Sequence, residues 1–91
     1  MPFAFDVSLD VHLVKAQARM RYQIERHANN WVVTIAVLAP VAHTSSQVIV
    51  TSDAILERYA ALHREIDILV QNGWTARIVS DSMQRLGGFR P

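Results

Sequence analysis

The sequence contains no cysteine, and only 19% of its 91 residues are charged. Without cysteine there is no disulfide framework, no thiolate zinc site and no cysteine nucleophile. Nine Lys and Arg residues nearly balance eight Asp and Glu residues, so the net charge of +1 is not that of a strongly basic nucleic-acid binder. Hydrophobic residues make up 51%, which is typical of a chain that folds rather than of a disordered segment.

Signals for export and for membrane insertion are also missing. A secretory signal needs a basic start and an apolar stretch, whereas residues 1–15 carry Asp6 and Asp10 and alternate in polarity. The apolar run from Trp31 to Ala42 has twelve residues, fewer than the roughly 20 that span a bilayer. We therefore expect a soluble, cytoplasmic protein that does not bind membranes. The length fits one domain, which we assign to residues 1–81, with a flexible tail at 82–91.

Two segments near the start of the chain alternate in polarity. Residues 3–13 do so with period two, which predicts a half-buried strand. Residues 15–27 also alternate, but they are rich in good helix formers, so a strand and a helix both stay open for this segment. A strand is favoured because two Asn residues, typical of a hairpin turn, separate it from a β-rich run at residues 31–39.

The hairpin predicts its own register. If Asn29 and Asn30 are the loop residues, Ile24 lies opposite Ile35. The large apolar side chains of residues 15–27 then all lie on one face of the sheet. No Gly, Pro, Asn or Asp stands between Leu13 and Ala16, so we do not expect a tight turn there.

One long helix is predicted after a loop at residues 41–47 and a short strand at 47–51. Ser52 or Asp53 suits its N-cap, and Asn72-Gly73 suits its end. Between these points one apolar arc is formed by Ile55, Leu56, Tyr59, Leu62, His63, Ile66, Leu69 and Val70. Residues 74–80 predict a last strand, joined to the short strand by a right-handed crossover between parallel strands. The fold class is therefore α+β: a small antiparallel or mixed sheet, in the order β-β-β-β-α-β, packed on one long helix.

The third predicted strand has an apolar face on which no predicted element of the chain can pack. Residues 31–39 are apolar on both faces, and one helix covers only one face of a sheet. We expect a homodimer with Val32, Ala36 and Leu38 at the interface, although the same surface could bind a different protein. Residues 3–13 could pair within the chain or with a second protomer.

A basic strip is the second candidate site. Lys15, Arg19 and Arg21 share the polar side of residues 15–27, and arginine side chains suit phosphates. The strip could bind nucleic acid, but Asp6 and Asp10 of the first strand could equally neutralise its arginines.

His63 and Asp67 form the third candidate, a low-ranking pocket pair. A histidine with a carboxylate four residues later on a helix could act as an oriented base, although most such residues are packed at the rim of a core. No metal-ligand spacing, cofactor motif or catalytic set accompanies the pair, so we predict no metal, no cofactor and no catalytic residues.

Three functions follow, in decreasing order of preference. The first is a non-enzymatic, self-associating protein-interaction module that binds through its sheet. The second is a nucleic-acid-binding domain that uses the basic strip of residues 15–27. The third is a small dimeric enzyme with His63 in a pocket. No sequence motif here is specific enough to assign a family.

Overall fold

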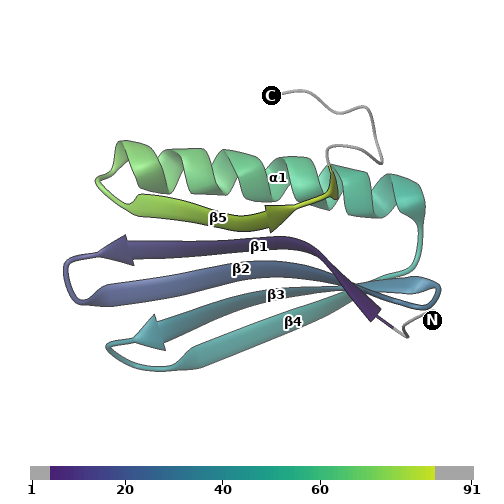
Figure 1. Cartoon of the computed structure of the whole chain (residues 1–91), viewed down its shortest axis with the longest axis horizontal. Coiled ribbons are helices and arrows are strands. Elements are labelled where there is room, and N and C mark those ends of the chain that lie inside the picture. Colours follow the sequence, from purple (N-terminus) through teal and green to yellow (C-terminus); the bar gives the residue numbers. More distant parts are fainter. Residues whose placement is uncertain (1–4, 84–91) are drawn as a thin grey trace.

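The computed structural model describes residues 5–83, which form five strands and one helix (Figure 1). In chain order the elements are β1 (Phe5–Lys15), β2 (Ala18–His27), β3 (Asn30–Ala39), β4 (His43–Ile49), α1 (Ser52–Gln71) and β5 (Thr75–Asp81). The predicted α+β class and element order are confirmed, and residues 15–27 belong to a strand hairpin rather than a helix. Within the described chain, no helix combines the length and hydropathy needed to cross a bilayer.

The strands form one antiparallel sheet in the order β4-β3-β2-β1-β5. β1 lies between β2 and β5, so the first strand pairs within the chain and both of its edges are occupied. β1 and β2 are joined by a tight turn at Ala16-Gln17, with Ala16 at φ 52°. The expectation that no tight turn forms here is therefore wrong, because an alanine takes the left-handed conformation that glycine or asparagine usually supplies.

The predicted register between β2 and β3 is wrong by two residues. The turn consists of Ala28, at φ 54°, and Asn29, while Asn30 already belongs to β3 and pairs with His27. Ile24 consequently lies opposite Val33 instead of Ile35. Because the shift is an even number of residues, the side chains keep their predicted face of the sheet from Met20 to His27, and the pairing changes parity only at a register shift between Arg19 and Met20.

β4 and α1 also differ from the prediction at their boundaries. β4 begins at His43, so residues 43–46 are strand and not loop. The N-cap of α1 is Thr51, whose Oγ1 accepts a hydrogen bond from the amide of Ala54 at 3.2 Å. The helix ends before Gly73, whose φ of 99° favours glycine. Since neighbouring strands are antiparallel, β4 and β5 run in the same direction, but three strands separate them and α1 joins the two edges of the sheet.

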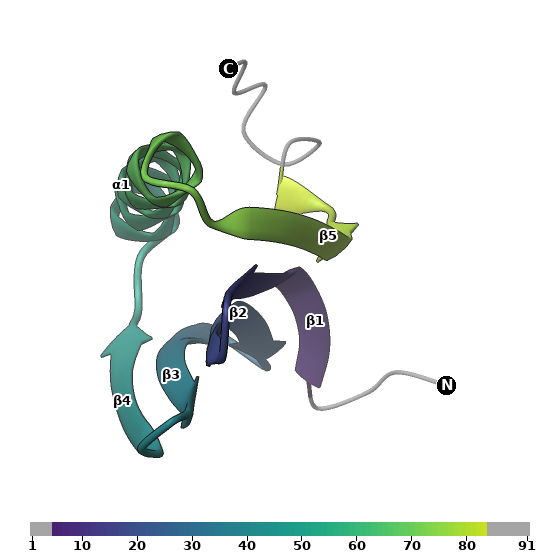
Figure 2. The same ribbon diagram turned by 90° about the vertical axis from the view of Figure 1, so that its left-hand side faces the viewer.

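The core lies between α1 and the face of the sheet that curves around it. Figure 2 shows the strands from β4 to β1 following an arc, with α1 across the open side between β4 and β5. The helix contributes four buried residues, whereas Val70 of the predicted arc is exposed. The core cluster consists of Leu9, Val11, Leu13, Tyr22, Ile24, Trp31, Val33, Ile49, Ile55, Tyr59, Leu62, Ile66 and Met83.

The chain remains packed for two residues beyond β5. The amide of Ser82 donates to the carbonyl oxygen of Ser8 at 2.8 Å, and Met83 is completely buried in the core cluster. These two residues therefore belong to the domain rather than to a tail. Residues 84–91, the rest of the predicted tail, lie outside the described residues.

Candidate functional site

The face of the sheet turned away from α1, the outer face, has two chemically different halves. The β1–β2 hairpin (residues 5–27), the ionic hairpin, carries all seven charged residues that precede α1 in the sequence. The β3–β4 hairpin (residues 30–49), the uncharged hairpin, has no Asp, Glu, Lys or Arg. The helix covers the opposite face, so both halves are turned toward solvent (Figure 2).

Asp10 and Arg21 of the ionic hairpin neutralise each other. Arg21 donates from Nε and Nη2 to the two carboxylate oxygens of Asp10, at 2.9 and 2.8 Å, and Nε2 of His12 lies 3.3 Å from the same carboxylate. This two-bond geometry is the strong form of an Arg–carboxylate pair. The Arg21 hydrogen bonds outweigh the effect of burial and lower the pKa of Asp10, and the Asp10 carboxylate raises the pKa of Arg21. The predicted neutralisation of Arg21 by Asp10 is thus confirmed.

The basic strip predicted from the sequence is not gathered in one place. Lys15 lies opposite Ala18, on the side of the sheet that carries Leu13, and its Nζ donates to the carbonyl oxygen of Asn72 beyond α1 at 2.7 Å. Arg21 is bound to Asp10. Of the three predicted cations, Arg19 is exposed and has neither an ion pair nor a side-chain hydrogen bond to the described residues. The sequence pattern groups Lys15 with the second strand, but the turn follows it, so Lys15 is the last residue of β1 and lies on the face that carries Leu13.

The uncharged hairpin contains the residues predicted for the interface. Val32 is half-buried, Ala36 is buried and Leu38 is exposed. Between Val32 and Ala36, the hydroxyls of Thr34 and Ser46 lie 3.3 Å apart and bridge β3 and β4. This half of the outer face is therefore weakly polar, and burial by a partner would remove no charge from water.

β4 is an edge strand whose side chains are exposed from His43 to Val48. Natural edge strands are usually protected by a charge, a proline or a bulge. β4 contains neither a charge nor a proline, and its described pairing with β3 has no register shift. Exposed apolar side chains flank it at both ends, Leu38 and Val41 near its start and Val48 and Val50 near its end, each 50 to 74% exposed.

The opposite edge strand, β5, is protected. It carries Arg77 and Asp81, and its pairing with β1 is interrupted by a register shift at Asp10 and Val11. Exposed apolar side chains occur here too, at Ile78 and Val79. The sheet therefore has one protected edge and one open edge.

His63 does not pair with Asp67, the partner predicted from helical spacing. Its Nε2 lies 3.3 Å from Oδ2 of Asp81 on β5, and its ring meets the ring of Tyr59 edge to face at 4.6 Å. The hydroxyl of Tyr59 donates to the same carboxylate at 2.9 Å, while Asp67 is exposed. These contacts tie α1 to the end of β5, and neither of the two described cavities is lined by Tyr59, His63 or Asp81. Sequence reasoning missed Asp81 because 18 residues separate it from His63.

No group of three or more His, Cys, Asp or Glu side chains within residues 5–83 is arranged to hold a metal ion. Comparison of the chain with protein-family models, with curated proteins and with solved structures found no match. Its function therefore has to be inferred from the surfaces described above.

Proposed function

We propose that the protein is a non-enzymatic module that self-associates through the open edge of its sheet. Two copies join along β4, antiparallel and related by a two-fold axis, so that the two sheets become one. The observation that carries this proposal is the exposed, uncharged and unbulged edge strand His43–Ile49. Pairing gives partners to backbone groups on the outer side of β4, as in other cases of strand addition.

The apolar residues around β4 favour a second copy as the occupant. In an antiparallel pair of identical strands, the start of one strand lies beside the end of the other. Val41 of one copy then lies near Val48 and Val50 of its partner, and the same contact repeats across the axis. These three exposed apolar side chains in each copy lose water in one arrangement.

Electrostatics and shape support the same arrangement. Residues 27–52 contain no Asp, Glu, Lys or Arg, so two identical edges meet without like charges facing each other. Packing of two outer faces is less favourable, because each sheet curves around its helix and two convex surfaces touch over a small area (Figure 2). Edge pairing leaves the predicted interface residues Val32, Ala36 and Leu38 one strand away from the contact, because all three belong to β3.

The contact between the two β4 strands is short, so we expect weak association. Seven residues of strand extend for about 24 Å, so the contact is smaller than the roughly 800 Å² per partner of a standard interface. A dissociation constant in the micromolar range is expected for a contact of this size and composition.

A matched pair of valines tests the proposal. Val48 on β4 and Val79 on β5 are 60 and 52% exposed on opposite edges of the sheet. Val48→Lys puts a charge into the apolar contact toward each end of the paired β4 strands and should raise the dissociation constant by about a hundredfold, whereas Val79→Lys should leave it unchanged. Sedimentation equilibrium across the micromolar range measures both, with circular dichroism as the control for folding.

The wild-type mass should rise from 10.3 kDa toward twice that value with concentration. A wild-type protein that stays at 10.3 kDa throughout would overturn self-association. Equal loss of association in both variants would overturn the assignment to β4.

A further inference from the structure

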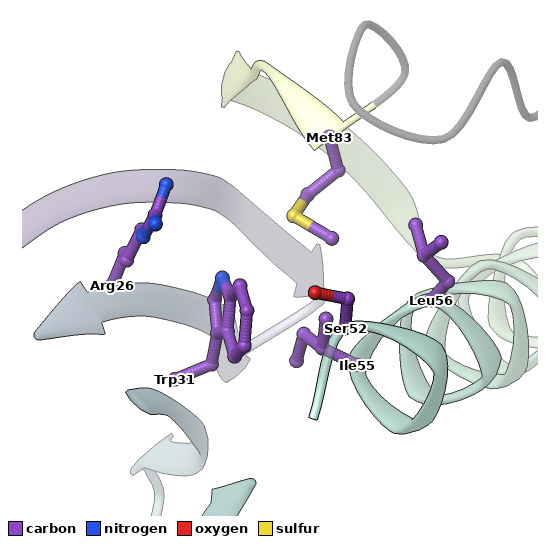
Figure 3. Close-up of a pocket in the computed structure, with 6 residues that line it drawn as sticks. All are labelled: Arg26, Trp31, Ser52, Ile55, Leu56 and Met83. Atoms are coloured by element: carbon purple, nitrogen blue, oxygen red, sulfur yellow. The ribbon is translucent and has the colours of Figure 1, made fainter. Parts of the chain in front are cut away.

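A small pocket lies where β2, β3, the start of α1 and Met83, two residues after β5, come together. It is lined by Arg26, Trp31, Ser52, Ile55, Leu56 and Met83 and has a volume of about 180 Å³. Figure 3 shows the side chain of Met83 reaching into the space between Trp31 and Leu56. Pockets for drug-sized ligands begin at about 300 Å³, so this one fits a smaller molecule.

Trp31 gives the pocket an unused hydrogen-bond donor. The residue is 7% exposed, and its indole Nε1 is buried with no hydrogen-bond partner among the described residues. The nitrogen edge of the ring is turned toward the space between Arg26 and Met83 (Figure 3). A buried N–H without an acceptor is costly, and native proteins rarely leave one unless a ligand, an ion or a water fills the place.

Two further donors border the same space. The guanidinium of Arg26 lies 5.5 Å from the centre of the Trp31 ring and has no ion pair among the described side chains. Ser52 contributes a hydroxyl and is the first residue of α1, where the helix dipole favours negative charge. The exposed Asp53 of the same turn does not line the pocket, and none of the six described lining residues is acidic.

The residues that line the pocket favour a carboxylate over a phosphate. Ile55, Leu56 and Met83 form an apolar side, and only one cation is present. One planar guanidinium fork matches a carboxylate, whereas a phosphate dianion usually requires several cations or backbone donors. The apolar side would hold a short hydrocarbon group on the same molecule.

We infer that this pocket binds a small organic carboxylate, with the carboxylate between Arg26, Trp31 Nε1 and Ser52 and a short aliphatic group against Ile55 and Leu56. Met83 moves aside when the ligand enters. An unbranched thioether side chain can do this at small cost. The site is independent of self-association, because β4 lies outside it.

The NMR signal of the Trp31 indole N–H reports ligand binding directly. In ¹H–¹⁵N spectra of the full chain, a Trp74→Phe variant assigns the two indole signals. Isovalerate should shift the Trp31 signal in a saturable way and leave the Trp74 signal in place. Isovaleramide, which has the same shape without the charge, should not shift the Trp31 signal.

Two exposed arginines of β2 provide a matched comparison. Arg26→Gln should weaken isovalerate binding by about tenfold or more, while Arg19→Gln, on the same strand but away from the pocket, should have no effect. The inference is overturned if isovalerate up to roughly 50 mM, far above the millimolar affinity expected of so small a ligand, leaves the Trp31 signal unmoved. Equal binding by the Arg26→Gln variant would also overturn it. Tighter binding of inorganic phosphate than of isovalerate would overturn the carboxylate assignment.

Discussion

The two hairpins of the sheet have the same architecture but opposite surface chemistry. In the ionic hairpin, Asp10 and Arg21 are joined by two short hydrogen bonds, so these two charges of its outer face already have partners within the chain. In the uncharged hairpin, β4 presents an open edge with exposed apolar residues at both ends. A surface whose groups are satisfied internally gains little from a partner, whereas an open, uncharged strand gains hydrogen bonds and apolar contact. The difference assigns stability to one hairpin and association to the other.

The largest effect on folding should come from breaking the pair of the ionic hairpin. Arg21→Met leaves the Asp10 carboxylate, which is 9% exposed, without its main partner. We expect a loss of about 2 kcal/mol in the free energy of unfolding, less than for a fully buried pair because Arg21 is 38% exposed and solvent screens it. Denaturant unfolding measures the loss. Arg19→Met, the matched change on the same strand, should cost less than about 0.5 kcal/mol.

The Arg21→Met variant also tests whether the ionic hairpin takes part in self-association. The dissociation constant of the Arg21→Met variant should equal that of the wild type, as long as the variant is folded. A change in self-association with this substitution would show that the two hairpins do not have separate roles.

A smaller effect is expected where β5 is tied to the helix. Tyr59→Phe removes the donor that reaches Asp81 at 2.9 Å and should lower the free energy of unfolding by about 1 to 2 kcal/mol. Tyr22→Phe is the matched control, because the Tyr22 hydroxyl reaches Glu65 only at 3.5 Å and should contribute about 0.5 kcal/mol or less. Equal losses in the two variants would contradict the role given to Asp81.

The smallest effect is the pH dependence of the ionic hairpin. Because the pKa of Asp10 is lowered in the folded protein, mainly by the Arg21 hydrogen bonds, the pair stabilises the fold at pH values above the unfolded pKa of about 3.9. This contribution should be lost as the pH falls below about 4 and through the folded pKa. Urea unfolding between about pH 2 and 6 should show a flatter pH profile for Asp10→Asn than for the wild type. If the free energy of unfolding of the Asp10→Asn variant depends on pH as steeply as that of the wild type, Asp10 does not cause the pH dependence.

Periodic features of the sequence predicted much of this fold. The alternation of β1 and the apolar arc of α1 depend on many residues, so they survive local irregularities, and the parity of β2 and β3 survived a two-residue error in register. β4 was placed too late because six of its seven side chains are exposed, and an exposed edge strand has no apolar alternation to detect.

Single residues account for most of the errors. Ala16 and Ala28 both adopt positive φ in tight turns, and alanine gives no sequence signal for this conformation. His63 pairs with Asp81 across two elements, a contact that depends on how β5 docks against α1. The Trp31 pocket likewise forms from three separate parts of the chain, namely the β2–β3 hairpin, the start of α1 and Met83, and only the pairing of Arg26 with Trp31 is local in sequence.

Amide hydrogen exchange at two protein concentrations tests the central claim, that two copies join along β4, most directly. The outward-facing amides of β4, between His43 and Ile49, should exchange more slowly at high than at low micromolar concentration, because a second β4 covers them. The outward-facing amides of β5, between Thr75 and Asp81, should exchange at the same rate at both concentrations. If the exchange rates in β4 do not depend on concentration, or if protection appears in β5 instead, the two copies do not join along β4.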